Sequence, residues 1–243
     1  MMLEVKNLKK HFGGIKAIDG CSFSVPRGKI IAIIGPNGSG KSTTFNVISH
    51  LLEKDSGKII FDGNDLGDVD DFTIARRGVS RTFQHVRLFK NLTIKDHMEI
   101  ALCQDDESLF KNIFGVKDDF TKKIEEILDF VGLHKSLKTY GSDLSYGQRK
   151  LLDLAMAIAK PHQLLMLDEP VAGVNPKLRV GIKNIVKGLR TNGETILLIE
   201  HDMNFVMDLA DWIIVMDYGK IIAEGKPNAI QNNKKVLEAY LGE

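Results

Sequence analysis

The chain has 243 residues, of which 43% are hydrophobic and 27% are charged, which is enough to bury a substantial core in one domain. Its 33 basic and 32 acidic residues leave a formal net charge of +1, which argues against broad binding to nucleic acid or to an anionic membrane. Two cysteines provide no disulfide framework or metal-binding spacing, and no apolar run reaches the roughly 18 residues that a membrane-spanning helix needs. The composition therefore predicts an intracellular globular protein that meets a membrane only through a partner.

The first residues predict two strands of a partly exposed antiparallel sheet. Alternating polar and apolar residues run from Leu3 to Leu8 and again from Ala17 to Val25. Phe12 lies between them, beside the Gly13-Gly14 turn. Its ring would either pack in the core or stack on a planar ligand such as a nucleotide base, and the residues alone favour neither interpretation.

A buried strand then leads through a glycine-rich turn into a helix. Ile30 to Ile34 is a short β-branched run typical of a parallel strand covered on both faces, and Ser42 to Leu52 has helical spacing. The turn between them, Gly35-Pro36-Asn37-Gly38-Ser39-Gly40-Lys41-Ser42, matches the phosphate-loop pattern G-x-x-x-x-G-K-S/T. An ordinary tight turn is the alternative, but this pattern is expected by chance in only about one chain in a hundred of this length.

This turn carries the first predicted ligand contacts. Its glycines let the backbone wrap closely around a polyphosphate, and amide groups of the loop and of the helix start donate to phosphate oxygens. We expect Lys41 to reach the β- and γ-phosphates and Ser42 to bind Mg²⁺. The predicted nucleotide-binding residues of this segment are Gly35, Pro36, Asn37, Gly38, Ser39, Gly40, Lys41, Ser42 and Thr43.

Further along, the pattern changes from strands to helices. Lys58 to Phe61 and Ser80 to Gln84 indicate two more strands, the second of which ends in a polar residue. From about Ile94 to Ile158 the spacing is helical, which predicts a helical subdomain inserted between the core segments 1–93 and 159–243. Its clearest apolar stripe consists of Ile124, Ile127, Leu128 and Val131. Residues 104–119 have only a weak period and predict a loose connection.

Two later strands end in residues suited to phosphate chemistry. Leu164 to Leu167 is an apolar run closed by Asp168 and Glu169, and Thr195 to Ile199 leads to His201. Because parallel strands present their C-terminal ends to a ligand crevice, we expect an aspartate that organises Mg²⁺ and a glutamate that activates water there. An isolated Asp-Glu pair usually begins a solvated loop, and a single histidine is more often structural. The upstream phosphate loop favours the functional interpretation of the acids, and the position after a buried strand favours that of the histidine.

The chain closes with a hairpin and a helix. Trp212 to Met216 and Lys220 to Ala223 predict two strands joined across Asp217-Tyr218-Gly219. The last predicted helix, Lys234 to Leu241, has enough apolar residues for one packed face, namely Val236, Leu237, Tyr240 and Leu241.

In their order and approximate spacing, these residues resemble the ATP-binding subunits of ABC transporters over essentially the whole chain. The resemblance rests on the phosphate loop, on Gln84 after a strand, on the run Leu144-Ser145-Tyr146-Gly147-Gln148, on Met166 to Glu169 and on His201. It implies an α/β fold, with a P-loop NTPase core, an antiparallel β subdomain on the N-terminal side and an inserted α-helical subdomain. It also implies hydrolysis of ATP to ADP and phosphate with the help of Mg²⁺.

The resemblance implies a role for each of the matching residues. Phe12 would stack on adenine, Glu169 would act as the general base, and His201 would contact the γ-phosphate. Gln84 would sense Mg²⁺ and the attacking water, and Asp168 would support the metal. Ser145, Gly147 and Gln148 would form the signature loop, which in the family binds the ATP held by a second subunit. A helix N-cap at Ser145 is a compatible alternative role.

Two departures from the commonest family pattern narrow the resemblance to the branched-chain amino-acid importers. Tyr146 stands where the usual signature loop has glycine, and Asn175 stands where an aspartate is commoner. The stretches from Arg81 to Phe89 and from Ala239 to Glu243 are similar to the same subgroup. The resemblance implies a second ATP-binding subunit in a head-to-tail homo- or heterodimer, membrane permease subunits and, indirectly, a solute-binding protein. No nucleic-acid partner is implied, and the expected location is the cytoplasmic face of the inner membrane, reached through the permease.

The stretch from Gln84 to Phe89 also predicts a docking surface. In similar proteins this region forms the groove that receives a short cytoplasmic helix of the membrane subunit. Leu88 and Phe89 are apolar beside residues of exposed character, His85 and Arg87. Burial of Phe89 in the core is the alternative, and the residues alone do not decide between the two.

Other functions are weighed against this one. A guanine-nucleotide switch needs an N-K-x-D segment, and the nearest run, Asn233-Lys234-Lys235-Val236, lacks the aspartate. A soluble ABC-type ATPase acting on DNA or ribosomes would be supported by tandem cassettes or a basic surface, and neither is seen in the sequence. Glu169 and His201 argue against a catalytically dead binding module. Within transport, import of amides or urea and extraction of a lipid stay open, because the membrane subunit decides the cargo.

Overall fold

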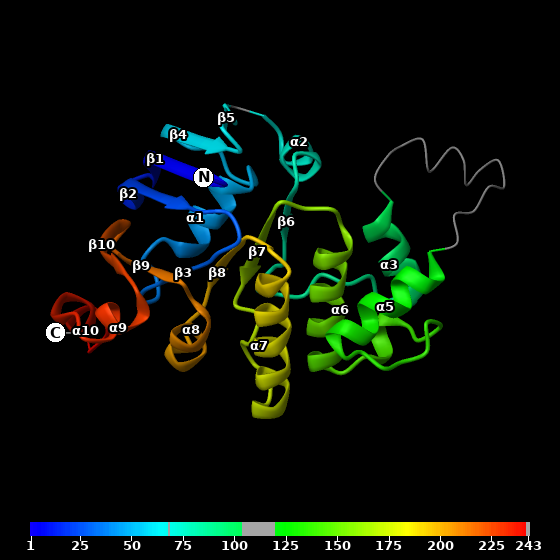
Figure 1. Ribbon diagram of the computed structural model, residues 1–243. Coiled ribbons are helices and arrows are strands. Elements are labelled where there is room, and N and C mark those ends of the chain that lie inside the picture. Colours follow the sequence, from blue (N-terminus) through cyan, green and yellow to red (C-terminus); the bar gives the residue numbers. More distant parts are fainter. Residues whose placement is uncertain (68, 104–119, 242–243) are drawn as a thin grey trace.

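Two β-sheets and the helices around them make up the computed structural model, which describes residues 1–67, 69–103 and 120–241 (Figure 1). The first sheet is antiparallel, and its strands follow the order β2-β1-β4-β5. It contains β1 (Leu3–Phe12), β2 (Ile15–Val25), β4 (Ser56–Phe61) and β5 (Asn64–Asp65). This is the antiparallel sheet that the alternating N-terminal residues predict, although its first two strands extend to the turn that follows Phe12.

The second sheet has the order β10-β9-β3-β8-β7-β6 and is parallel except for the pairing of β9 with β10. It contains β3 (Ile30–Ile34), β6 (Val79–Arg81), β7 (Leu164–Asp168), β8 (Ile196–Ile199), β9 (Trp212–Asp217) and β10 (Lys220–Gly225). Every residue of β3, β7 and β8 is buried, as their continuous apolar runs predict. The hairpin across Asp217-Tyr218-Gly219 is also confirmed.

Helices cover both faces of the parallel sheet. In chain order they are α1 (Lys41–Ile48), α2 (Asp71–Arg76), α3 (Ile94–Leu102), α5 (Thr121–Val131), the 3₁₀ turn η1 (Gly141–Asp143), α6 (Tyr146–Ala159), α7 (Pro176–Thr191), α8 (Met203–Leu209), α9 (Pro227–Gln231) and α10 (Lys234–Leu241). In Figure 1, α3, α5 and α6 lie together on the side away from the N-terminal sheet. These are the helices of the predicted insertion. The weakly periodic residues 104–119 lie outside the described residues.

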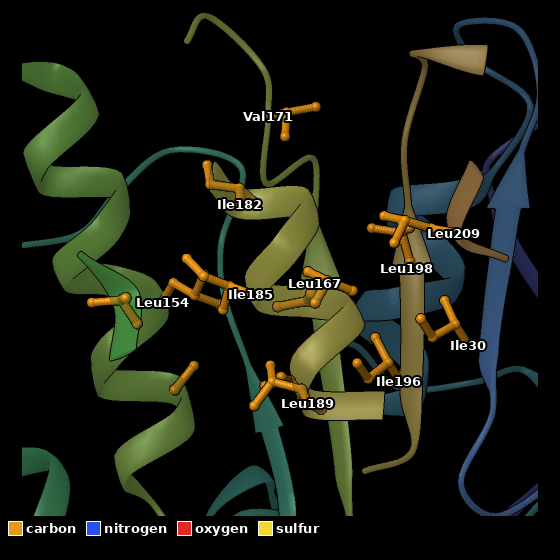
Figure 2. Close-up of a cluster of buried hydrophobic side chains, with 14 of the residues drawn as sticks. Ile30, Leu154, Leu167, Val171, Ile182, Ile185, Leu189, Ile196, Leu198 and Leu209 are labelled. Atoms are coloured by element: carbon orange, nitrogen blue, oxygen red, sulfur yellow. The ribbon is translucent and has the colours of Figure 1, made fainter. Parts of the chain in front are cut away.

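Alternate residues of β3 enter two separate hydrophobic clusters because successive side chains of a strand point to opposite faces. Ile31 and Ile33 join a cluster with α1 and the antiparallel sheet, whereas Ile30 and Ile34 join the cluster under α6, α7 and α8. Figure 2 shows this second cluster, in which Ile182 and Ile185 of α7 lie between the sheet and α6. The parallel sheet is therefore held from both sides.

Two further boundaries and one packed face also differ from the sequence prediction. The helix expected to reach Leu52 ends at Ile48, because the Ser49 hydroxyl donates to the Phe45 carbonyl at 2.9 Å and His50 takes a left-handed φ of 54°. The strand expected to include Gln84 ends at Arg81, so Gln84 lies in a loop. On α10, Val236 is buried as predicted but Leu237 is exposed, so the packed face is narrower than expected.

The C-terminal ends of the parallel strands meet at one edge of the sheet. The phosphate loop follows β3, Gln84 follows β6, Glu169 follows β7 and His201 follows β8. Since β6, β7, β8 and β3 are consecutive neighbours, this topology places the predicted site residues along one crevice.

Candidate functional site

The glycine-rich loop between β3 and α1 needs glycine at two positions. Gly35 has a φ of 150°, and a Cβ built there would lie 2.0 Å from the carbonyl oxygen of Met216. At Gly40, with a φ of 102°, a Cβ would lie 2.1 Å from the carbonyl oxygen of Ala17. Any larger residue would collide with the backbone of a neighbouring strand or hairpin. The loop is thus held between the two sheets while its N–H groups stay available for an anion.

Lys41 is buried within this loop. Its ammonium group donates to the carbonyl oxygens of Gly35 at 2.9 Å and Pro36 at 2.8 Å, and to the Ser39 hydroxyl at 3.3 Å. Burial lowers the pKa of Lys41, while the nearby carboxylates of Glu169 and Asp168 act to raise it. The loop therefore concentrates one cation beside two acids, the charge pattern that a polyphosphate and a metal ion need.

Glu169, Gln84 and His201 meet although they come from three different segments. One carboxylate oxygen of Glu169 accepts from Gln84 Nε2 at 2.9 Å, and the other lies 2.9 Å from His201 Nε2. The Glu169 side chain is 10% exposed and that of His201 38% exposed, so the pair lies at the mouth of the crevice. Glu169 also has a left-handed φ of 48°, a conformation that costs energy outside glycine and often marks a functional position. The three predicted catalytic residues are thus brought together, and their roles stay predictions.

Asp168 forms a buried ion pair that the sequence prediction missed. Arg81 Nη2 donates to Asp168 Oδ2 at 3.0 Å, and the two side chains are 7% and 4% exposed. The guanidinium group also donates to the Ser49 hydroxyl at 2.7 Å and lies against the rings of Phe45 and Phe83. Burial raises the pKa of Asp168, and Arg81 counteracts this shift. A basic residue inside a strand of this sheet was the available signal.

Lys150 on α6 is a second cation that the sequence prediction missed, and it contacts the backbone of Glu169. Its ammonium group donates to the carbonyl oxygens of Gln84 and Glu169, both at 3.1 Å. Burial lowers the pKa of Lys150, and nearby carboxylates, led by Asp153, act to raise it. Lysine is almost never fully buried without a partner, so its 4% exposure indicates a specific role.

A crevice of about 500 Å³ joins the predicted site residues. It is lined by Gly14, Ile15, Lys16, Ala17, Asn37, Gly38, Gly40, Lys41, Ser42, Thr43, Gln84, Glu169, His201 and Tyr218. Its volume and convergent polar groups suit a small-molecule ligand. Tyr218, 86% exposed at the hairpin between β9 and β10, is a lining residue that the sequence prediction did not include.

Phe12 lies outside this lining, at the end of the first hairpin. Its side chain is 46% exposed and lies beside Lys10, whose ammonium group is 5.5 Å from the ring centroid. The alternative that Phe12 packs in the core is therefore wrong. Stacking on a base stays a prediction, and the exposed ring beside residues 14–17 of the crevice is compatible with it.

Ser145, Gly147 and Gln148 lie apart from the crevice, at the start of α6. The Ser145 hydroxyl accepts from the Gln148 N–H at 3.3 Å, and the Gln148 side chain accepts from the Ser145 N–H at 3.0 Å. This capping box confirms the predicted N-cap. A Cβ on Gly147 would lie 2.6 Å from Leu178 Cδ2 of α7, so a larger residue there would displace that leucine side chain. Within one chain, these residues do not reach the phosphate loop's crevice.

The parallel sheet, the phosphate loop after its central strand and the acids after a neighbouring strand define a P-loop nucleoside triphosphatase. The antiparallel sheet and the helices α3, α5 and α6 are additions to that core. None of the helices in the described part of the chain is long and apolar enough to cross a membrane.

Comparisons with known proteins identify the family. The model described as "ABC transporter" matches residues 18–172, and one described as "Branched-chain amino acid ATP-binding cassette transporter" matches residues 220–243. The chain is 38% identical over 245 residues to a probable branched-chain amino acid transport ATP-binding protein, LivG, of Archaeoglobus fulgidus, covering 99% of this chain and 95% of that protein. It is 36% identical over 250 residues to the high-affinity branched-chain amino acid transport ATP-binding protein BraF of Pseudomonas aeruginosa, covering 100% and 98%.

Solved structures agree with this result. The ADP conformation of an ATP-binding cassette of an ABC transporter matches with a TM-score of 0.84 at 35% identity, covering 100% of this chain and 99% of that chain. A dimeric cassette in a post-hydrolysis state, bound to ADP and phosphate, matches with a TM-score of 0.82 at 25% identity, covering 93% and 99%. The chain belongs to the ABC transporter family, and it is one of that family's ATP-binding, ATP-hydrolysing subunits.

Proposed function

We propose that this subunit hydrolyses ATP to power the import of branched-chain amino acids through partner membrane subunits. The main support for ATP hydrolysis is that one crevice beside Lys41 contains Gln84, Glu169 and His201. The relatives named for branched-chain amino acid transport and the C-terminal match over residues 220–243 support the cargo. The amino acid itself would bind only to other subunits.

On binding of ATP, the ammonium group of Lys41 would exchange acceptors in its own loop for oxygens of the phosphates. Lys41 now donates to three oxygens of its own loop, and phosphate oxygens, which carry formal charge, are stronger acceptors than carbonyl groups. The amide groups of Gly35 to Thr43 would hold the remaining phosphate oxygens. Positioning and charge neutralisation of this kind supply most of the catalysis in phosphoryl transfer.

Glu169 would orient the attacking water and accept its proton. His201 and Gln84 hold its two carboxylate oxygens from opposite sides, so the acid has one defined orientation. The same His201 would donate to the γ-phosphate once ATP is bound. As water attacks the γ-phosphorus, the bond to the β-γ bridging oxygen breaks and ADP leaves with that electron pair.

The residues at this edge also fit Mg²⁺. Asp168 Oδ1 is buried and finds no hydrogen-bond partner among the described residues. The side-chain amide of Gln84 donates to Glu169 through its nitrogen, which leaves the side-chain oxygen Oε1 to face a metal ion. Among the residues that the structure describes, no group of three His, Cys, Asp or Glu side chains could hold a metal ion by itself. Ser42, Gln84 and Asp168 would hold the ion, which when bound neutralises charge on the β- and γ-phosphates.

Two surfaces of the chain would bind its protein partners. Ser145, Gly147 and Gln148 would complete the site of a second subunit in a head-to-tail dimer, because they do not reach the crevice of their own chain. Phe89, 62% exposed, would contact a short cytoplasmic helix of a permease subunit and hold this chain at the cytoplasmic face of the membrane. A solute-binding protein would act only through the permease.

Uptake by cells that lack only this chain tests the proposal. We expect loss of leucine, isoleucine and valine uptake, recovery with the unchanged chain, and no recovery with Glu169→Gln. Normal uptake of these amino acids together with loss of another solute would contradict the cargo. Recovery by Glu169→Gln would contradict the proposed chemistry.

A further inference from the structure

The N-terminal part of α6 contacts both segments that carry the proposed catalytic residues. Lys150 donates to the carbonyl oxygen of Gln84 and to that of Glu169, each at 3.1 Å. These two residues follow β6 and β7, which are neighbouring strands. A single buried ammonium group therefore joins the loop of Gln84, the turn of Glu169 and helix α6.

One helical turn earlier, Tyr146 makes a second contact with the same segment. Tyr146 and Lys150 are four residues apart, so they lie on one face of α6. The Tyr146 hydroxyl donates to the carbonyl oxygen of Ala172 at 3.3 Å. Its ring lies close to Gly173, where an added Cβ would be 3.1 Å from the ring edge.

The two contacts hold opposite ends of one short turn. The Ala172 N–H donates to the carbonyl oxygen of Glu169 at 3.2 Å, which closes the turn from Glu169 to Ala172. Lys150 binds that same Glu169 oxygen, and Tyr146 binds the Ala172 oxygen. These hydrogen bonds surround Glu169, which has a left-handed φ of 48°. Strained conformations of this kind persist where the surroundings fix them.

Packing alone does not explain a cation at position 150. Removing an ammonium group from water is costly unless the surroundings compensate for it. Here the compensation comes from two backbone carbonyls and from the nearby carboxylates of Asp153, Glu200 and Glu169. An apolar side chain of similar length would fill the same space but could not bind the two carbonyl groups.

We propose that Lys150 and Tyr146 are positioning residues that make α6 and the turn carrying Glu169 move as one unit. The proposal rests on the proposed role of Glu169 as the base. Because Ser145 and Gln148 lie on the same first turn of α6, a shift of that turn against a second subunit is transmitted to the base of its own chain. The contacts of Lys150 and Tyr146, here called the clamp, thus link the nucleotide site of one subunit to that of the other.

Lys150→Met removes the donor and keeps the length of the side chain, and Lys150→Arg keeps a cation. We expect kcat for ATP hydrolysis to fall by about 100-fold in Lys150→Met, the cost of misplacing a catalytic group by about 1 Å. ATP affinity, measured by nucleotide titration, is expected to change less than about threefold, because Lys150 does not line the crevice. Lys150→Arg is expected to recover part of kcat. The exposed Lys187 of α7 provides the matched control, Lys187→Met, with unchanged kcat.

A fall in kcat at unchanged ATP affinity separates positioning of the base from a purely structural role, and hydrogen exchange locates the segment that loosens. We expect the amides of Glu169, Val171, Ala172 and Gly173 to exchange at least about tenfold faster in Lys150→Met, with α6 and α7 unchanged. Should Lys150→Met fail to fold, Tyr146→Phe decides the question, since this exposed residue loses only its hydroxyl. Faster exchange at residues 169–173 with lowered kcat in Tyr146→Phe supports the clamp.

Normal kcat and normal exchange in Tyr146→Phe, together with normal values in any folded Lys150→Met, would overturn the proposal. A decrease in ATP affinity without a decrease in kcat would overturn it as well. These outcomes are distinct from failure of the proposed function, in which Glu169→Gln itself would retain turnover.

Discussion

Lys41 donates to three oxygen atoms of its own loop, and a bound phosphate would have to replace at least some of them. Hydrogen bonds to charged groups contribute about 1.5 to 3 kcal/mol, so we expect Lys41→Ala to weaken Mg-ATP binding by roughly 10- to 100-fold. Fluorescent-nucleotide titration measures the affinity, and circular dichroism checks the fold. Unchanged affinity and turnover in the folded variant would remove the basis for assigning phosphate binding to this loop.

Asp153 on α6 is expected to make the stability of the protein depend on pH. Burial raises its pKa from 3.8 to about 7, while Lys150 counteracts the shift. Between about pH 4 and pH 7 the unfolded chain loses this proton and the folded chain keeps it, so the free energy of unfolding falls by roughly 4 kcal/mol over that range. We expect Asp153→Asn to remove this fall, measured by urea unfolding at about pH 5 and about pH 8. Equal pH dependence in the two proteins would show that Asp153 is ionised throughout.

At the scale of elements, α7 supports the sheet edge from which Glu169 and His201 project. Ile182 is 1% exposed and packs in the cluster of Figure 2, whereas Val180 on the same helix is 52% exposed. We expect Ile182→Ala to lower the free energy of unfolding by about 2 to 5 kcal/mol, and Val180→Ala to change it by less than about 0.5 kcal/mol. Chemical denaturation of both variants measures the difference. Equal losses would contradict the assigned core face.

The strands that form the site edge were predictable because they are buried on both faces. β3, β7 and β8 appear in the sequence as unbroken apolar runs, and the residues that follow them carry the polar groups. The end of α1 at Ile48 was not predictable from spacing, because apolar residues continue after it. It depends on the local bond of Ser49 and on the backbone of His50.

The acceptors of the two supporting cations could not be predicted from the sequence, although the position of Arg81 inside a strand was a signal for a buried ion pair. Arg81 and Asp168 are 87 residues apart, and Lys150 binds a carbonyl 66 residues away. Such contacts depend on which strands become neighbours, and a backbone carbonyl acceptor leaves no trace in the residue types. Glu169 and His201 were predicted from their positions after buried strands, which place them at one sheet edge. The role of Gln84 was predicted only from the resemblance to the family.

At the scale of the whole molecule, Phe89 tests attachment to the membrane partner. Its ring is 62% exposed beside His97, so the alternative that it belongs to the core is wrong. We expect Phe89→Asp to reduce recovery of permease subunits in a pull-down by at least about tenfold, while ATP binding stays unchanged. Leu237→Asp on α10, where Leu237 is 48% exposed, is the matched control. Full permease recovery with folded Phe89→Asp would refute this docking surface.

The oligomeric state of Glu169→Gln tests the composite site most directly. This change keeps the size of the side chain but removes the base, so bound ATP persists and a higher affinity for the closed dimer becomes visible. We predict that the variant elutes as a dimer with Mg-ATP and as a monomer with ADP. Adding Ser145→Arg is expected to abolish the dimer, because the bulky cation would occupy the proposed nucleotide contact. A double variant that dimerises as well as Glu169→Gln alone would contradict nucleotide binding by the residues that begin α6.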